Sequence, residues 1–148
     1  MKYIFYTMLS LFVLASCKTS KNYLSRSDSD NTIFDAVKTL KKYSTDTAAL
    51  NALPVLYNTA LQRNLRKINS YSSSRELSRW DKIIDGYNTL QEMHDAIIEV
   101  DAASRLVTPV DYRQTIYDLQ QQAAADYYTT AIDFLNRPGR KKKKKAYN

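Results

Sequence analysis

The chain contains one histidine, His94, and one cysteine, Cys17, so few of its side chains could carry out catalysis. A histidine can act as a general base or a metal ligand, but a transition-metal site would need a second histidine or a free cysteine. No nucleophile–histidine motif is present, and two glycines are too few for a phosphate-binding loop. We therefore predict no enzyme activity, no metal site and no cofactor.

We expect His94 to lie at the edge of the core, bonded to a carboxylate or a backbone carbonyl. It falls within an apolar stripe, between Leu90 and Ile97. The adjacent Asp95 is expected on a different face of the same helix. The other nearby acidic residues are predicted to form a solvated helix face: Asp81, Asp85 and Glu92.

The surroundings of Cys17 indicate lipid attachment rather than catalysis. Lys2 precedes a mostly apolar run, Tyr3 to Ala15, which is too short to span a membrane stably but suits a signal peptide. The run ends in Leu14-Ala15-Ser16-Cys17, which resembles the lipobox of bacterial lipoproteins. The alternative is an uncleaved N-terminal anchor helix.

The lipobox resemblance implies that residues 1–16 are removed as a signal peptide and that Cys17 carries acyl chains such as palmitate. Two or more such chains anchor a protein stably in a membrane. In lipoproteins of this kind, aspartate after the cysteine is associated with inner-membrane retention. Here the position is Lys18, which implies the periplasmic side of the outer membrane. No second cysteine exists, so the body cannot form an internal disulfide.

Most of the net charge of +7 lies in a basic C-terminal tail, residues 137–148. The basic residues of this tail are Arg137, Arg140, Lys141, Lys142, Lys143, Lys144 and Lys145. Residues 18–136 are nearly balanced in charge, so we predict no nucleic-acid binding. The tail could bind anionic lipid or glycan, form a solvated helix end, or mark a truncation before a further helix.

Few glycines and prolines, together with apolar residues at three- and four-residue steps, predict an all-α fold. We expect a flexible, serine- and aspartate-rich tether over residues 17–30 and a helical domain over 31–136. Four helices are predicted: from Asp30 or Asn31 to about Tyr43, from Asp46 or Thr47 to about Ile68, from Ser73 or Ser74 to about Ala102, and from Pro109 to about residue 136. Pro54 predicts either a kink in the second helix or a start just before it, and Gly86 a close helix crossing.

Three of the expected helices share a local pattern with a tyrosine at its start, namely Tyr57-Asn58-Thr59-Ala60, Tyr87-Asn88-Thr89-Leu90 and Tyr128-Thr129-Thr130-Ala131. Together with the segment from Ala123 to Tyr147, this pattern resembles tetratricopeptide-type helical repeats. The spacing is irregular and the helices are long, so a simple up-and-down bundle is an equal alternative.

The preferred interpretation is a periplasmic lipoprotein, attached to the membrane through Cys17, whose antiparallel helices form a scaffold for an envelope protein partner. The alternative is an electrostatic tether that binds anionic lipid or glycan through the basic tail. A tyrosine-rich surface would receive the partner, with Tyr57, Tyr87, Tyr127 and Tyr128 as candidates. For each of these tyrosines, packing in the core is the competing interpretation.

Overall fold

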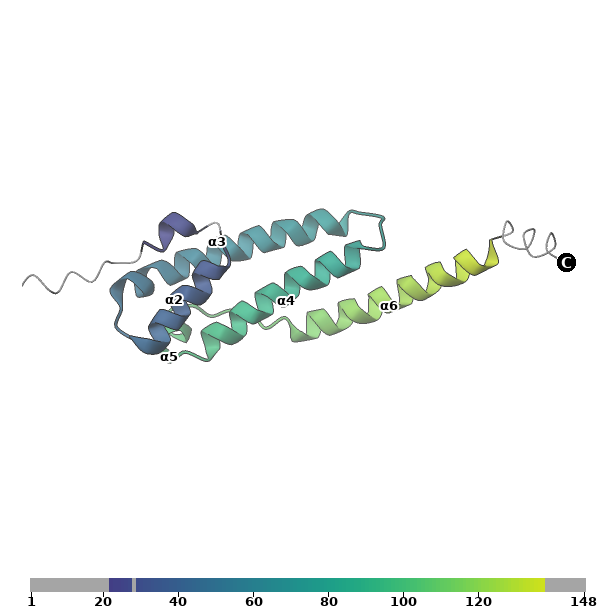
Figure 1. Cartoon of the computed structure of the whole chain (residues 1–148). Helices are drawn as coiled ribbons and strands as arrows, with labels where there is room; N and C mark the ends of the chain where they lie inside the picture. Colours follow the sequence, from purple (N-terminus) through teal and green to yellow (C-terminus); the bar gives the residue numbers. More distant parts are fainter. Residues whose placement is uncertain (1–21, 28, 138–148) are drawn as a thin grey trace, which may run out of the picture.

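The computed structural model describes residues 22–27 and 29–137, and every regular element within these ranges is a helix (Figure 1). The elements are η2 (Leu24–Arg26), α2 (Asn31–Lys42), α3 (Thr47–Ser72), α4 (Arg79–Ile98), α5 (Asp101–Ser104) and α6 (Arg113–Asn136). Four of them are long helices packed antiparallel, which confirms the predicted all-α array. Among the described residues, no helix is long and apolar enough to cross a bilayer.

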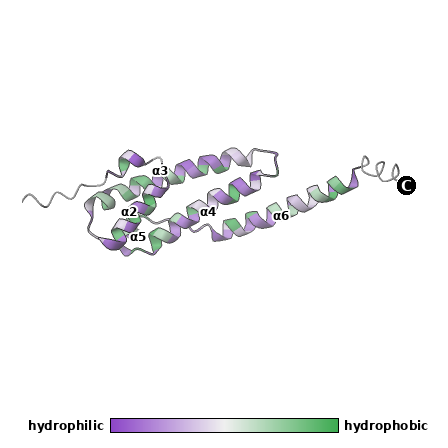
Figure 2. Cartoon of the chain, in the orientation of Figure 1, coloured by the Kyte–Doolittle hydropathy of each residue, from purple (hydrophilic) through white to green (hydrophobic). Residues whose placement is uncertain are grey.

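The helices α3 and α4 form a central antiparallel hairpin, and the other elements pack against it. At the open end of the hairpin, α2 contacts α3, α4 and the short α5. The chain then turns back, so that α6 runs along α4 and continues past the loop that joins α3 and α4 (Figure 1). Hydropathy alternates along each long helix, as expected for helices that bury one face (Figure 2).

The start of α3 is set by Asp46, one of the two caps predicted for it. The Asp46 carboxylate accepts a hydrogen bond of 2.9 Å from the backbone N–H of Ala49. The helix continues through Pro54 to Ser72, so the alternative start just before this proline is wrong.

The start of α4 lies at Arg79, later than the predicted residue 73 or 74. Residues 76–78 form a bend and a turn instead, and the Arg79 backbone N–H donates to the Glu76 carbonyl at 3.1 Å. The short loop between Ser72 and Arg79 still reverses the chain, so α3 and α4 are antiparallel as predicted.

The core lies where α2, α4 and α5 converge on α3. Its fully buried large side chains include Ile33, Leu40, Leu53, Leu56, Leu90, Met93 and Ile97. Farther along the hairpin, α3 and α4 approach closely at Gly86, as predicted. A Cβ atom at this position would lie 2.7 Å from Cγ1 of the buried Ile68.

Residues 22–27, 29 and 30, which belong to the predicted tether, pack on the body. Tyr23 is only 5% exposed, and its hydroxyl donates to Thr39 Oγ1 at 2.8 Å. Arg63 of α3 bonds to the Ser27 carbonyl at 3.1 Å and to the Asp30 carboxylate. The buried ring of Tyr23 and this ion pair hold a mostly polar segment against the body.

The repeated tyrosine pattern has two different environments in the fold. In the first two copies, Ala60 and Leu90 are buried, at 1% and 2% exposed. In the third, Tyr128 is 70% exposed and Ala131 is also exposed. The equivalent positions of the three copies are therefore not buried to the same extent. The antiparallel packing of the helices does not test a repeat relationship, which stays a prediction.

Candidate protein-binding groove

A polar cluster on α4 holds the start of α6, and it contains the only histidine. The buried Gln91 side chain accepts a hydrogen bond of 2.6 Å from the Tyr112 backbone N–H and donates to Asp95 at 2.9 Å. Asp95 also accepts from Arg113 at 2.5 Å, and Nδ1 of His94 lies 2.9 Å from the same carboxylate oxygen. These contacts place the start of α6 at Arg113 rather than at the predicted proline.

His94 is at the core edge and bonded to a carboxylate, as predicted, with its side chain 13% exposed. Its partner is the adjacent Asp95, which lies on the more exposed face of the helix and whose side chain reaches the His94 ring. In the described part of the chain, no group of three or more histidine, cysteine, aspartate or glutamate residues could hold a metal ion. The bonds from this cluster to Tyr112 and Arg113 join α4 to the start of α6.

Replacing Asp95 by asparagine is expected to make the protein less sensitive to acid. The hydrogen bond from His94, followed by those from Gln91 and the charge of Arg113, lowers the pKa of Asp95 below its usual 3.8. A lowered pKa means that ionised Asp95 stabilises the fold above the usual value and that this contribution is lost as the pH falls. Urea unfolding between about pH 5 and pH 2 should show a smaller loss of stability in Asp95→Asn than in the wild type.

The matched control for this titration is Asp85→Asn, because Asp85 is exposed on the same helix and forms no ion pair among the described residues. It should follow the wild-type curve. Parallel curves for the wild type and Asp95→Asn would contradict the prediction.

A second set of polar contacts holds α6 near the end of the hairpin. The Asp126 carboxylate accepts hydrogen bonds from Arg79 Nη2 and Trp80 Nε1, both at 2.8 Å. The hydroxyl of Tyr127 donates to the Leu77 carbonyl at 3.2 Å. Together with the polar cluster around Gln91, these bonds hold α6 along α4. The helix α3 packs on another side of α4.

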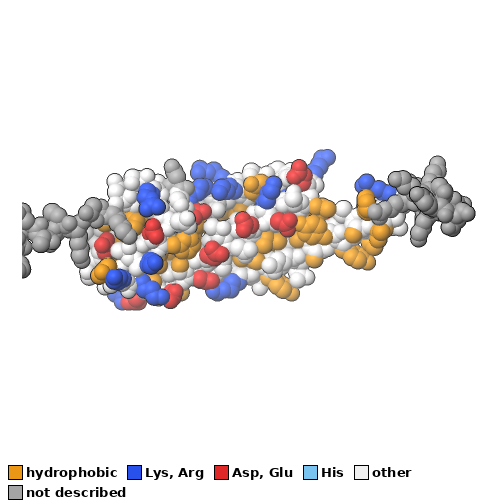
Figure 3. Space-filling view, in the orientation of Figure 1, with side chains coloured by type: hydrophobic (Ala, Val, Ile, Leu, Met, Phe, Trp, Pro, Cys, Tyr) orange, Lys and Arg blue, Asp and Glu red, His pale blue; other side chains and the backbone are white. Residues whose placement is uncertain are grey.

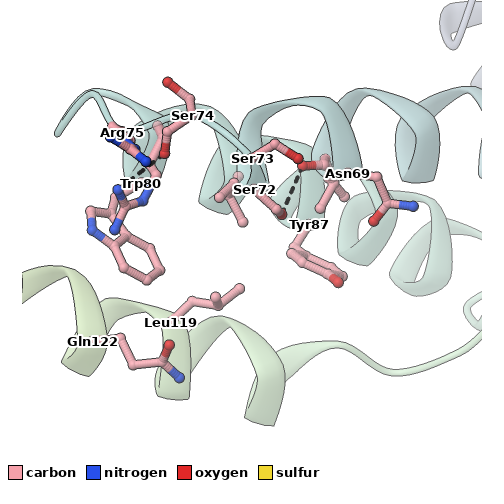
Figure 4. Close-up of a pocket in the computed structure, with 12 residues that line it drawn as sticks. Asn69, Ser72, Ser73, Ser74, Arg75, Trp80, Tyr87, Leu119 and Gln122 are labelled. Carbon is pink, nitrogen blue, oxygen red and sulfur yellow. Dashed lines mark hydrogen bonds between the residues drawn. The ribbon is translucent and has the colours of Figure 1, made fainter.

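An open cavity of about 480 Å³ lies between α3 and α6, with α4 as its floor (Figure 4). We call this cavity the α3–α6 groove. Its apolar lining consists of Ile68, Trp80, Ile83, Tyr87 and Leu119. The rings of Trp80 and Tyr87 from α4 and the Leu119 side chain from α6 face the open space, with polar side chains beside them, an arrangement that suits an amphipathic segment of a partner (Figure 4).

The rim of the α3–α6 groove is polar and carries positive charge. Asn69, Ser72, Ser73 and Ser74 form one edge, and Gln122 lies on the opposite one. Both charged residues of the lining are arginines, Arg75 and Arg79. Arg79 is engaged by Asp126, whereas the exposed Arg75 forms no ion pair among the described residues. The groove therefore presents one uncompensated cation beside an apolar floor.

The four predicted tyrosines do not form one surface. Tyr57 is 6% exposed and lies in the core, which is the competing interpretation given for it; burial is the main cause that raises its pKa. Tyr87 lines the α3–α6 groove, with its ring centroid 5.3 Å from that of Tyr112. Tyr127 is 37% exposed and bonded to the hairpin loop, and Tyr128 is exposed outside the groove lining.

Most residues of the groove were not predicted as a site. Trp80 is not among the predicted contact residues, and Leu119 and Gln122 belong to a helix that is distant in sequence. No local signal connects these positions, because the groove exists only once three helices are placed. The single tryptophan near a helix start was the one available clue.

The predicted lipid-attachment residue Cys17 lies outside the described residues, as do Arg140, Lys141, Lys142, Lys143, Lys144 and Lys145. Arg137 directly follows α6 and is exposed. None of the protein-family models, curated proteins or solved structures compared with this chain matches it.

Proposed function

We propose that the protein is a lipid-anchored scaffold of the bacterial cell envelope, which binds a partner protein in the α3–α6 groove. The observation that carries the proposal is the groove itself, which has an apolar floor and a polar, cationic rim. The lipobox-like sequence that ends in Cys17 supports anchoring on the periplasmic side of the outer membrane. The proposed role is binding, without catalysis.

The ordered segment around Tyr23 supports action close to the membrane. Six residue steps separate Cys17 from Tyr23, which is buried against the body. A fully extended chain covers about 20–22 Å over six residues. An acylated Cys17 would therefore hold the helical body next to the bilayer, where its partner must also be found.

The proposed occupant of the groove is an amphipathic helix of the partner protein. The groove has a volume of about 480 Å³, which accommodates side chains of such a helix rather than its backbone. The helix would therefore lie over the groove and insert side chains between α3 and α6. Its apolar face would cover Trp80 and Leu119. An acidic side chain on its edge would complement Arg75, because the lining contains no acidic residue.

Site-specific photocrosslinking in native envelopes tests this proposal. A photoreactive residue at Gln122, on the groove rim, should form an adduct with one envelope protein. The same residue at Gln120 is the matched control, because Gln120 is exposed on α6 but does not line the groove. Equal adducts at both positions would contradict binding in the groove.

Charge reversal tests the chemistry of the partner. We expect Arg75→Glu to reduce the adduct at Gln122 several-fold, because an acidic partner would be repelled. Lys67→Glu reverses a charge on an exposed residue of α3 outside the lining and should leave the adduct unchanged. An adduct that is insensitive to Arg75→Glu would contradict an acidic partner.

The anchor is tested separately by Cys17→Ala. This variant should lose metabolic labelling with palmitate, whereas the wild type should incorporate it. Absence of label from the wild type would refute lipid attachment while leaving groove binding open to the crosslinking result.

A further inference from the structure

The distal part of α6 extends past the rest of the molecule. Ala123 is the last buried residue of this helix, and every described residue from 128 to 137 is exposed. In Figure 1 this part of α6 continues beyond the loop that joins α3 and α4. It therefore lies outside the core and apart from the groove lining.

One side of this extension is apolar. Tyr128, Ile132 and Leu135 follow one another at four- and three-residue steps, which places them on one face of the helix. They are 70%, 39% and 60% exposed, and we call them the distal apolar face. Hydrophobic side chains gather on this part of the molecule in Figure 3. Such a concentration of exposed apolar residues is typical of an interaction site.

Positive charge follows the distal apolar face directly. From residue 128 to 148 the sequence has seven basic residues and one acidic residue, Asp133. Arg137 comes immediately after the last helical residue, and Arg140 and the five lysines follow. By contrast, residues 18–136 are nearly balanced in charge. An apolar helix face beside a basic cluster has the chemistry of helices that lie in the surface of an anionic bilayer.

We propose that the distal apolar face inserts into the surface of an anionic phospholipid bilayer, with Arg137 at the phosphate groups and the positive charge of the sequence after it adding to the attraction. Tyr128 suits the interfacial region, because its ring can be buried while its hydroxyl stays hydrated. Ile132 and Leu135 enter the boundary between headgroups and acyl chains. This contact is additional to the groove and requires neither an acylated Cys17 nor a protein partner.

A fluorescent label at position 132 tests the insertion in the full chain. Because Cys17 is the only cysteine, Cys17→Ala/Ile132→Cys carries a single thiol. The control, Cys17→Ala/Ile98→Cys, labels an apolar residue that is 51% exposed near the other end of the body. An environment-sensitive dye is attached to each variant. Its quenching by spin-labelled lipid is measured in vesicles of phosphatidylcholine alone or with added phosphatidylglycerol.

With phosphatidylglycerol present, quenching at position 132 should exceed that at position 98 several-fold. This excess should disappear with K141Q/K142Q/K143Q/K144Q/K145Q and in 1 M salt, where the screening length falls to about 3 Å. Equal quenching at the two positions, or an excess that is insensitive to lipid charge, would overturn the proposal. Protection of position 132 without vesicles, growing with protein concentration, would also overturn it, because a second copy would then cover the face.

Discussion

Gly86→Val is expected to lower the free energy of unfolding by about 1–3 kcal/mol, the range for inserting side-chain atoms into a well-packed contact. Even a Cβ atom at this position would lie 2.7 Å from Ile68 Cγ1. That atom adjoins the Cβ of a side chain only 3% exposed, so it cannot move away freely. Valine adds two further methyl groups and must push α3 away from α4. Equilibrium urea unfolding measures the loss.

The matched control is Asn88→Val, an exposed position on the same helix, which should change stability by no more than about 0.5 kcal/mol. A double-mutant cycle identifies the contact. Ile68→Ala alone should cost about 2–5 kcal/mol, but combined with Gly86→Val the total should fall below the sum, because valine fills the space that isoleucine leaves. Strict additivity would contradict the close approach.

Tyr23→Ala should lower the free energy of unfolding by about 3 kcal/mol, the cost of removing a buried aromatic side chain. Tyr23 is 5% exposed, and its hydroxyl donates a hydrogen bond to Thr39 of α2. Without the ring, residues 22–27, 29 and 30 would be held by Arg63 and by the Thr32 hydroxyl, which donates to the Arg26 carbonyl at 2.7 Å. Hydrogen exchange of these residues should therefore become faster, while that of α4 should change only through the lower global stability.

Tyr23→Phe separates the ring from the hydroxyl. It removes only the 2.8 Å hydrogen bond to Thr39 and should cost about 1 kcal/mol. Equal losses for the two variants, or unchanged exchange in Tyr23→Ala, would show that the ring does not hold this segment. In a lipid-anchored protein, releasing the segment would lengthen the reach from Cys17 to Ile33, the next buried apolar residue, and allow the groove to move away from the bilayer.

The two proposed contacts use different parts of the molecule. The α3–α6 groove is lined by the hairpin and the middle of α6, whereas the distal apolar face lies beyond the hairpin. A protein held at the bilayer by Cys17 and by the distal end of α6 could still present the groove to a partner. The crosslinking and lipid-quenching experiments report on these contacts independently.

The all-α fold follows from the sequence alone, because helix signals are local. Apolar residues at three- and four-residue steps mark the buried face of each helix, and Asp46 marks the start of α3. Even Gly86 could be interpreted correctly, since glycine within a strong helical pattern indicates a close neighbour. Each inference needs only residues within a few turns of one another.

Only the tertiary structure decided which apolar faces are covered. The pattern around Tyr57 and that around Tyr128 are similar in sequence, yet Tyr57 is 6% exposed and Tyr128 is 70% exposed. Likewise, nothing local showed that Tyr23 would dock on the body or that Trp80 and Leu119 would line one groove. Periodicity specifies that a face is apolar, but burial depends on whether a distant segment reaches it, and that is determined by the packing of the whole chain.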